Sequence, residues 1–286
     1  MEVLKAGLIL EGGGMRGIYT TGILDYFMEK GIAFENAYGV SAGACHLASY
    51  MSQQPGRALR ICLNFLDNEY YCSFKSYIKT GDLFNVELNY DKIPNELDPF
   101  DYETAKKWPG HAYAVVTNVE TGRAEYLEMR DFRECMDALR ASASLPLVSR
   151  LVEYHGKKYL DGGMADSIPL RHSIKDGNKK NIVVLTRPLD YRKKPQSFTN
   201  AQMMLAKYPK YPKLRRAMHR RAAVYNKTLD VIERMEEEGK IFVLRPEKLV
   251  KIERIEKDPK KLKVLYLQGY HDAAINYEAM RGYLES

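Results

Sequence analysis

The alternation of apolar and polar residues divides the chain into short buried strands and amphipathic helices. Apolar runs of about four to eight residues, bounded by glycine, proline or polar residues, predict strands. They cover residues 6–10, 37–40, 112–119, 124–129, 151–154, 157–160, 181–186 and 241–244. Apolar residues at helical spacing predict helices at 18–30, 45–51, 57–68, 131–141, 213–238 and 260–284. Strands that alternate with helices are typical of α/β proteins, so we expect a three-layer α/β/α sandwich with a mainly parallel central sheet.

A glycine-rich segment, Glu11-Gly12-Gly13-Gly14-Met15-Arg16-Gly17, lies between the first predicted strand and the first predicted helix. Successive backbone N–H groups in such a loop, together with a helix N-terminus, form a site for an anion. Gly12, Gly14 and Gly17 also match the G-x-G-x-x-G pattern of a dinucleotide site, with Glu35 about 20 residues further on. Glu35, however, precedes the second apolar run instead of following it, which favours an oxyanion site over a dinucleotide site.

The second apolar run ends in Gly39-Val40-Ser41-Ala42-Gly43. This G-x-S-x-G pattern is typical of a nucleophile elbow, a tight turn from strand to helix that exposes the serine hydroxyl. Small neighbours are required because strand and helix pack closely there, and Gly39, Ala42 and Gly43 are small. Taken alone, the pentapeptide is equally compatible with an ordinary turn.

A second polar residue follows a strand at Asp161, where Gly162 and Gly163 allow the backbone to turn sharply. Sites in open α/β sheets lie beyond the carboxyl ends of the strands, so we expect the glycine loop, Ser41 and Asp161 to meet at one edge. A Ser-His-Asp triad in the chain order of α/β-hydrolases would place its histidine after the aspartate. That order leaves three candidates: His172, His219 and His271.

Charge and cysteine content bear on location and partners. Apolar residues make up 45% of the chain and charged residues 28%, as in ordinary globular proteins. Four cysteines without a C-x-x-C pair indicate reduced thiols in a cytoplasmic protein. We expect no signal peptide, no membrane span, no metal and no cofactor, since no apolar run of sufficient length and no cluster of metal ligands is present in the sequence.

The segment 187–221 holds eleven lysines and arginines against one aspartate. A solvated face is the ordinary reading of such a run. Mixed with aromatic residues, it also indicates peripheral contact with an anionic membrane surface. No nucleic-acid-binding motif accompanies it, so we expect no nucleic-acid partner.

Together these motifs resemble the patatin-like phospholipase family. The resemblance rests on Glu11–Gly17, Gly39–Gly43, Ala141-Ser142-Ala143-Ser144-Leu145-Pro146 and Asp161-Gly162-Gly163, which stand in the family's order and cover roughly residues 6–188. Glu11 departs from the family's usual aspartate, a conservative change. The resemblance implies a patatin-like catalytic domain at 1–190 and a basic, mainly helical C-terminal extension, packed on it, at 191–286.

The resemblance further implies a Ser-Asp dyad that cleaves lipid or fatty-acyl esters through an acyl-enzyme. Ser41 is the expected nucleophile and Asp161 the expected proton acceptor. The remaining expected site residues fall into two groups. Oxyanion and substrate-binding residues are Gly12, Gly13, Gly14, Met15, Arg16, Gly17 and Ala42, and the glycines of the two turns are Gly39, Gly43, Gly162 and Gly163.

Two other functions remain open on the sequence. One is a dinucleotide-binding oxidoreductase, and the other is a lipid-binding regulatory protein with little turnover. For a lipid hydrolase, aromatic residues between the predicted helices are candidates for an acyl pocket, although ordinary packing is the commoner role of each. These residues are Tyr70, Tyr71, Phe74, Tyr77 and Phe84.

Overall fold

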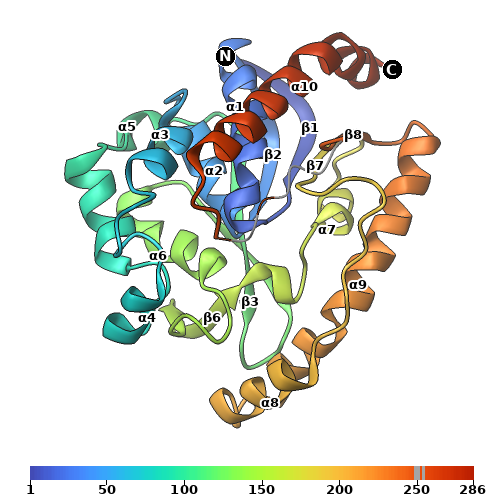
Figure 1. The fold of residues 1–286 in the computed structure, drawn as a ribbon. Helices are drawn as coiled ribbons and strands as arrows, with labels where there is room; N and C mark the ends of the chain where they lie inside the picture. Colours follow the sequence, from blue (N-terminus) through green and yellow to red (C-terminus); the bar gives the residue numbers. More distant parts are fainter. Residues whose placement is uncertain (248–251, 253–254) are drawn as a thin grey trace.

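The computed structural model describes residues 1–247, 252 and 255–286 (Figure 1). Within these residues an eight-stranded sheet lies between helices, and its strand order is β5-β6-β3-β2-β1-β7-β8, with β4 beside β3. The strands are β1 (Glu2–Leu10), β2 (Ile32–Val40), β3 (His111–Asn118), β4 (Ala124–Glu128), β5 (Val152–Tyr154), β6 (Lys157–Asp161), β7 (Asn181–Val184) and β8 (Phe242–Leu244).

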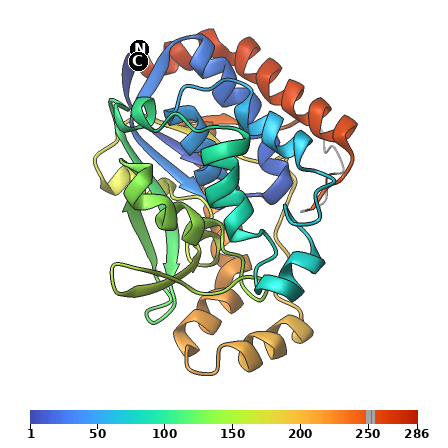
Figure 2. The ribbon, with the colours of Figure 1, turned by 90° about the vertical axis from the view of Figure 1, so that its left-hand side faces the viewer.

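Helices cover both faces of the sheet (Figures 1 and 2), which confirms the expected three-layer α/β sandwich with C-terminal helices. They are α1 (Ile18–Glu29), α2 (Ala42–Met51), α3 (Arg57–Asn64), α4 (Phe74–Thr80), α5 (Tyr102–Lys106), α6 (Phe132–Ala143), α7 (Leu170–Lys175), α8 (Phe198–Lys207), α9 (Pro212–Glu237) and α10 (Pro259–Glu285). Shorter or irregular helices are η1 (Gly14–Gly17), η2 (Leu88–Leu97) and η3 (Gly162–Met164).

The sheet is parallel on one side and antiparallel on the other. Strands β3, β2, β1, β7 and β8 run parallel, whereas β4 and β6 are antiparallel to β3, and β5 to β6. The predicted strand at 157–160 therefore does not join the parallel set. Only two residues, His155 and Gly156, connect it to its hairpin partner β5, and so tight a turn forces antiparallel pairing of the two strands.

One edge of β3 is shared by two strands that meet end to end. β2 pairs with β3 up to Val40 opposite Val115, and β6 pairs with β3 from the next residue on, with Asp161, the last residue of β6, opposite Val116. β4 occupies the other edge, where its pairing overlaps both registers. The last residues of β2 and β6 therefore lie at consecutive positions along β3, although 121 residues separate Val40 from Asp161 in sequence.

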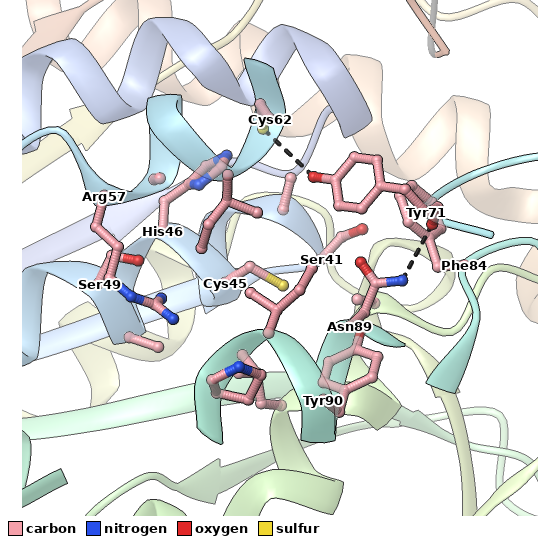
Figure 3. A pocket seen from close by; sticks show the side chains of 18 of the residues that line it. Ser41, Cys45, His46, Ser49, Arg57, Cys62, Tyr71, Phe84, Asn89 and Tyr90 are labelled. Carbon is pink, nitrogen blue, oxygen red and sulfur yellow. Dashed lines mark hydrogen bonds between the residues drawn. The ribbon is translucent and has the colours of Figure 1, made fainter. Parts of the chain in front are cut away.

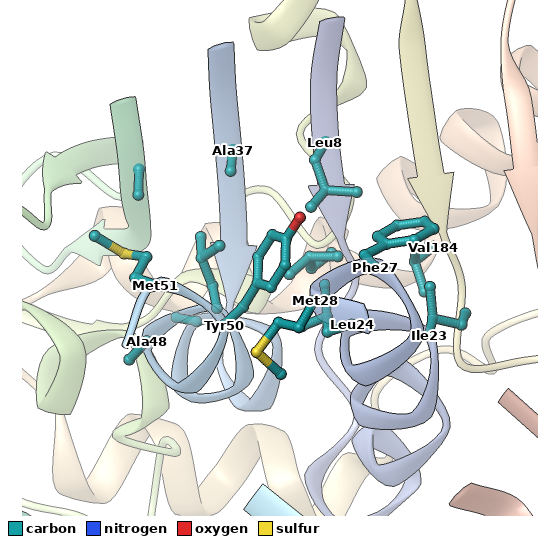
Figure 4. Packing of buried hydrophobic residues seen from close by; sticks show 14 of the residues in the cluster. Leu8, Ile23, Leu24, Phe27, Met28, Ala37, Ala48, Tyr50, Met51 and Val184 are labelled. Atoms are coloured by element: carbon teal, nitrogen blue, oxygen red, sulfur yellow. The ribbon is translucent and has the colours of Figure 1, made fainter. Parts of the chain in front are cut away.

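Alternate residues of the strands pack against the two helical layers, as the two-residue period of a strand requires. Leu8 packs with Ile23 and Phe27 of α1 and with Tyr50 of α2 (Figure 4). Ile9, the next residue of β1, packs in a separate cluster on the opposite face. Its partners there are Tyr38, Ile168, Leu170, Tyr225, Leu229 and Ile232.

The two long C-terminal helices pack on opposite faces of the sheet, α9 in the cluster around Ile9 and α10 in the cluster that contains α1. α9 contributes Tyr225, Leu229 and Ile232 to the cluster around Ile9. α10 crosses α1 so closely that two glycines face backbone: a Cβ atom on Gly269 would lie 2.0 Å from the Tyr19 carbonyl oxygen, and one on Gly22 would lie 2.1 Å from the Tyr266 carbonyl oxygen. No described helix is long and apolar enough to cross a membrane.

The glycine contact predicts how α10 responds to substitution. Gly269→Ala should lower the free energy of unfolding by about 1–3 kcal/mol or more, because the new methyl group meets rigid backbone of α1. Gly282→Ala on the same helix meets no atom within 4 Å and should raise stability by up to about 1 kcal/mol through helix propensity. Urea unfolding of both variants measures the difference, and equal stabilities would contradict the proposed packing constraint.

Candidate active site

Ser41 stands in a strained turn between β2 and α2. Its backbone angles are φ 55° and ψ −122°, a region that non-glycine residues rarely adopt, at a cost of about 1–3 kcal/mol. The N–H groups of Ala44 and Cys45 donate to its carbonyl oxygen at 2.9 and 3.2 Å. Strand and helix touch at Gly39, where a Cβ atom would lie 2.5 Å from the Cα of Ala44. The turn therefore depends on small residues and on surroundings that hold it.

The C-terminal end of α6 holds both Ser41 and Asp161. The hydroxyl of Ser142, which is fully buried, accepts a hydrogen bond from the Ser41 N–H at 2.9 Å and donates to the Val115 carbonyl at 2.7 Å. Two residues later, the Ser144 carbonyl accepts from the Asp161 N–H at 2.8 Å. Ser142 and Ser144 are both buried. If either hydrogen bond were lost, neither water nor another protein group could take the place of the missing partner.

The Asp161 side chain is buried beside the end of β2. One carboxylate oxygen, Oδ1, accepts from the Gly163 N–H at 2.7 Å. The other, Oδ2, is buried and has no hydrogen-bond partner within the described residues. Thr117 donates to the Asp161 carbonyl at 2.8 Å, which fixes the strand end against β3. One carboxylate oxygen is thus anchored and the other is available to a group in the site.

The glycine loop presses against Ser41. A Cβ atom on Gly12 would lie 2.8 Å from the Val40 carbonyl oxygen and 2.9 Å from the Ser41 Cβ. Gly14, at φ 58°, begins the 3-10 helix η1, which leads directly into α1. The first N–H groups of a helix lack intrahelical acceptors, so the loop and the start of α2 present donors beside Ser41.

Glu11, the residue before the three glycines, anchors this loop through buried hydrogen bonds. Its side chain is 4% exposed. One carboxylate oxygen accepts from the Thr186 N–H at 2.7 Å and from the Thr186 hydroxyl at 3.0 Å, and the other accepts from the Tyr225 hydroxyl at 2.5 Å. Glu11 therefore links the start of the glycine loop to Thr186, just after β7, and to Tyr225 of α9.

An apolar cavity of about 180 Å³ opens on one side of Ser41 (Figure 3). Tyr71 and Phe84, two of the five aromatic candidates, line it. Phe74 is 70% exposed instead, and Tyr70 and Tyr77 lie outside the lining. The other apolar lining residues are Met15, Ala42, Cys45, Ala48, Ala58, Ile61, Cys62, Tyr90, Ile93, Pro94, Phe100, Phe132, Met136, Leu139, Ala143, Leu145 and Ile255.

A few polar side chains also line the apolar cavity (Figure 3). Burial lowers the pKa of His46 to about 4, so its ring is neutral near pH 7, and its Nε2 atom has no hydrogen-bond partner within the described residues. Arg57 is held by Asp98, with Nε 3.3 Å from Oδ1. Burial also raises the pKa of the Cys45 thiol to about 12, which excludes it as a nucleophile at neutral pH.

A smaller polar cavity, of about 40 Å³, lies on the Asp161 side of Ser41. Residues from the glycine loop, the two turns and the C-terminal part of the chain line it. They are Glu11, Gly12, Gly13, Gly14, Arg16, Val40, Ser41, Leu145, Asp161, Gly163, Ser167, Thr186, Arg187, Tyr191, Lys193, Arg221 and Tyr225. Ser41, Gly14 and Leu145 border both cavities, so the serine stands at their junction.

The residues expected at the site divide between these two cavities. Met15 and Ala42 line the apolar cavity, and Gly12, Gly13, Arg16, Asp161 and Gly163 line the polar one. The remaining expected residues border neither cavity and act within the backbone turns. They are Gly17, Gly39, Gly43 and Gly162.

The histidine candidates lie elsewhere. His172 stacks on Tyr126 with ring centroids 3.3 Å apart and pairs with Asp176 at 3.2 Å, outside both cavities. His219 and His271 border neither cavity. Across the described chain, no group of three or more His, Cys, Asp or Glu side chains is arranged to hold a metal ion.

Family models place these motifs among known proteins. The model described as "Patatin-like phospholipase" matches residues 8–174, and one described as "Domain of unknown function (DUF6363)" matches residues 211–285. The chain belongs to the patatin-like phospholipase family. The first match contains the glycine loop, Ser41 and Asp161, and it ends before the cationic residues of the polar cavity at 187–221.

Individual proteins are also similar. "Uncharacterized protein YjjU" of Escherichia coli (strain K12) is 27% identical over 248 residues, covering 85% of this chain and 69% of that protein. "Probable lipid hydrolase 463L" of Invertebrate iridescent virus 6 is 24% identical over 192 residues, covering 61% of this chain and 65% of that protein. The crystal structure of VipD from Legionella pneumophila superposes with a TM-score of 0.45 at 13% identity, covering 96% of this chain and 67% of that one.

Sequence reasoning missed several residues that shape this patatin-like site. Ser142 belongs to a segment that the family resemblance singled out, but its bond to Ser41 links positions 101 residues apart. Tyr225 falls within the helix predicted over 213–238, where nothing local indicates its bond to Glu11, 214 residues away. A polar hydroxyl on an otherwise apolar helix face was the available signal for Tyr225. For Ser142 the signal was a serine-rich helix end.

The buried His46 predicts a specific pH dependence of stability. Its pKa is about 4 when folded against about 6.5 when unfolded, so the neutral ring favours folding above pH 6.5 and that contribution is lost as the pH falls toward 4. The shift is worth about 3 kcal/mol between pH 7 and pH 4. His46→Gln should therefore lose about 3 kcal/mol less stability than the wild type over this range.

The matched control is His219→Gln, which alters an exposed histidine on α9. Urea unfolding at several pH values gives the slope of the free energy of unfolding against pH for each variant. The control should follow the wild-type curve, and a His46→Gln variant with the wild-type slope would contradict the assignment of a neutral, buried ring.

Proposed function

We propose that this chain is a serine acyl hydrolase that cleaves acyl esters of lipids through a dyad of Ser41 and Asp161. The observation that carries the proposal is the register of β3, which pairs Val40 and Asp161 with consecutive residues on one edge. The strained serine directly after one strand end and the buried carboxylate at the other line the same polar cavity. Membership of the patatin-like phospholipase family and the similarity to a viral protein named as a lipid hydrolase support the substrate class.

In the first step Ser41 Oγ attacks the ester carbonyl carbon while its proton passes to Asp161 Oδ2. The Oδ2 atom suits this role because Oδ1 is already bonded to the Gly163 N–H. Negative charge develops on the carbonyl oxygen, where N–H groups of the glycine loop and the N-terminus of α2 stabilise it. Losing one such donor costs about 10²–10³ in rate.

In the second step the tetrahedral intermediate collapses. The bond from carbonyl carbon to alcohol oxygen breaks, and Asp161 returns its proton to the departing alcohol. The acyl group stays on Ser41 until water, deprotonated by the same carboxylate, attacks the acyl carbon and releases the fatty acid. The reaction consumes one water and regenerates Ser41 and Asp161 in their starting forms.

The two cavities suit the two halves of such an ester. The apolar cavity is large enough for part of a fatty-acyl chain, and burial of its methylenes there is favourable by about 0.8 kcal/mol each. The polar cavity on the other side of Ser41 then receives the alcohol portion. We infer from this arrangement that the enzyme selects acyl chains and alcohol groups with separate sets of residues.

The dinucleotide alternative fits the geometry less well. Glu35 lies inside β2, exposed and five residues before the strand ends at Val40. The ribose-binding acid of a dinucleotide fold belongs at the end of that strand, near the glycine loop. A lipid-binding protein without turnover is the other alternative, and it differs from a hydrolase in the reactivity of Ser41.

Serine reactivity is the direct test of the dyad. A fluorophosphonate probe should label Ser41, and Ser41→Ala should abolish labelling and lower hydrolysis of a nitrophenyl ester by at least about 10³-fold. Asp161→Asn should cause a loss of similar size, because an amide cannot accept the serine proton. Ser52→Ala, at the far end of α2, is the control and should retain both properties.

The outcomes separate the candidate functions. Activity that survives in both Ser41→Ala and Asp161→Asn would contradict the dyad. Ester hydrolysis lost in His172→Ala with folding intact would indicate a triad instead. An unlabelled Ser41 in a protein that binds lipid would favour the regulatory alternative, and saturable NAD binding by calorimetry would favour the oxidoreductase.

We also propose that α8 contacts an anionic lipid surface during catalysis. Three apolar side chains of α8 are strongly exposed: Phe198 at 78%, Leu205 at 50% and Met203 at 44%. Lys207 at its end donates to the Leu147 carbonyl at 2.8 Å, which sets the helix close to Leu145 at the junction of the cavities. Apolar side chains among the cations of 187–221 suit insertion into an anionic interface.

Vesicle sedimentation tests this contact. The wild type should partition onto vesicles containing phosphatidylglycerol more strongly than onto pure phosphatidylcholine, and less strongly at high salt. Phe198→Ser should weaken partitioning by about tenfold to a hundredfold, since burying a phenylalanine side chain is worth about 1.5–3 kcal/mol. Val264→Ser removes another exposed apolar side chain, 55% exposed on α10, and should have no effect. Equal losses in both variants would contradict a role specific to α8.

A further inference from the structure

The apolar cavity that begins at Ser41 follows one face of α2. Ser41, Cys45 and Ser49 are spaced four residues apart, and all three line the cavity. Residues four apart lie on the same face of a helix, so the cavity extends along α2 away from the proposed nucleophile. At about 1.5 Å per residue, Ser49 lies about 12 Å further along the helix axis than Ser41. Figure 3 shows Ser49 on the far side of Cys45 from Ser41.

The cavity carries a polar side chain at this far end. Ser49 is 7% exposed, and within the described part of the chain its hydroxyl has no hydrogen-bond partner. The Ser52 hydroxyl bonds at 2.9 Å to the Ser49 carbonyl, not to its side chain. A hydroxyl that is buried without a partner is costly, so the contents of the cavity must supply a polar atom there.

Arg57 reaches the same end of the cavity from α3, which begins six residues after α2 ends. Its side chain is buried, and both of its printed polar contacts are with Asp98. Nη2 donates to the Asp98 carbonyl at 2.8 Å, and Nε lies 3.3 Å from Oδ1. Asp98 thus balances the charge and holds the guanidinium in place. The Nη1 atom takes part in neither contact, so it can donate to a neutral acceptor in the cavity.

His46 does not belong to this polar end, although it borders the cavity. A Cβ atom on Gly17 would lie 2.7 Å from its Nε2 atom, so the ring faces the start of α1. Between Ser41 and Ser49 the walls are mainly apolar, with Cys45 at the midpoint of α2. The cavity therefore combines an apolar channel with one polar end, formed by Ser49 and Arg57.

We infer that the apolar cavity binds an acyl chain that carries a hydroxyl group about ten carbons from the ester carbonyl, with Ser49 and Arg57 as its partners. The inference rests on the proposed function and names the acyl part of its substrate. An extended chain advances about 1.2 Å per bond, so about ten bonds span the distance along α2. A hydroxyl both donates and accepts, so it can accept from Arg57 Nη1 while it bonds to Ser49 Oγ.

A neutral hydroxyl suits this end better than the other groups a chain can carry. A carboxylate would add a second buried anion beside Asp98, whose charge already pairs with Arg57. An unsubstituted chain of the same length would displace water from Ser49 and Arg57 and leave both without its hydrogen bonds. The polar end therefore selects chains by the position of one oxygen atom.

The experiment compares nitrophenyl esters of decanoate, 10-hydroxydecanoate and 3-hydroxydecanoate. The wild type should cleave the 10-hydroxy ester with a kcat/KM at least equal to that of the decanoate ester. A terminal hydroxyl buried without partners would instead lower kcat/KM by about tenfold to a hundredfold, and that result would overturn the inference.

Ser49→Ala should lower the kcat/KM ratio of the 10-hydroxy ester to the decanoate ester by about fivefold to tenfold, the effect of one lost hydrogen bond. Ser49→Thr keeps a hydroxyl and should keep the ratio above that of Ser49→Ala. Arg57→Met should lower the ratio as well, and Asp98 retains its bonds from Arg60 at 2.6 and 2.9 Å in that variant. If Arg57→Met fails to fold, the Ser49 pair still decides.

Two controls test whether the effect belongs to this position. Ser52→Ala removes a hydroxyl less than one turn further on, outside the cavity lining, and should keep the wild-type ratio. The 3-hydroxy ester places its oxygen near Ser41, so its ratio to the decanoate ester should not change in Ser49→Ala. Equal losses for both hydroxy esters, or a wild-type ratio in Ser49→Ala, would overturn the inference.

Binding without turnover separates this inference from the proposed function. In calorimetric titrations, 10-hydroxydecanoic acid should bind at least as tightly as decanoic acid, and Ser49→Ala should weaken only the hydroxy acid. Weaker binding of the hydroxy acid to the wild type would overturn the inference. If no ester were cleaved and Ser41 stayed unlabelled, the proposed function would fail, while the titrations would still decide for or against the polar end.

Discussion

The pairing of β2 and β6 with one edge of β3 is the constraint on which the site depends. Val40 and Asp161 occupy consecutive positions along β3, and Ser142 locks the junction by bonding to both Ser41 and the Val115 carbonyl. A strained serine turn is stable only where its surroundings hold it. Here the restraint comes from buried hydrogen bonds that water cannot replace, so the geometry is present before a substrate arrives.

The same logic extends to the C-terminal helices. Glu11 carries the buried charge at the start of the glycine loop, and its hydrogen bonds come from Thr186 and Tyr225. A buried carboxylate stripped of such donors would be strongly destabilising. The loop therefore depends on α9, and α10 depends on α1 through the close contact at Gly269. Two helical layers far along the chain stabilise the same small region around Ser41.

The sequence was sufficient for features that are local. The turn at Ser41, the glycine loop and the strand 112–119 each follow from short patterns, and the structure places elements there. Short helices without a clear period, such as α7, α8 and η2, are absent from the prediction, and η2 contains Pro94, a residue that disfavours a regular helix interior. Strands β1 and β2 begin earlier than predicted, because polar residues such as Glu35 interrupt the apolar pattern.

What the sequence left open is long-range. Antiparallel pairing of β6 with β3, the contact of Tyr225 with Glu11 and the convergence of cations on one cavity all join segments over 40 residues apart. Those contacts also divide the lining of the site. The apolar cavity draws on residues 14–145 and Ile255, the polar cavity largely on the two strand ends and on 161–225, and only Gly14, Ser41 and Leu145 belong to both. Under the proposed function, these separate linings would let acyl and alcohol recognition change independently, with Ser41 fixed between them.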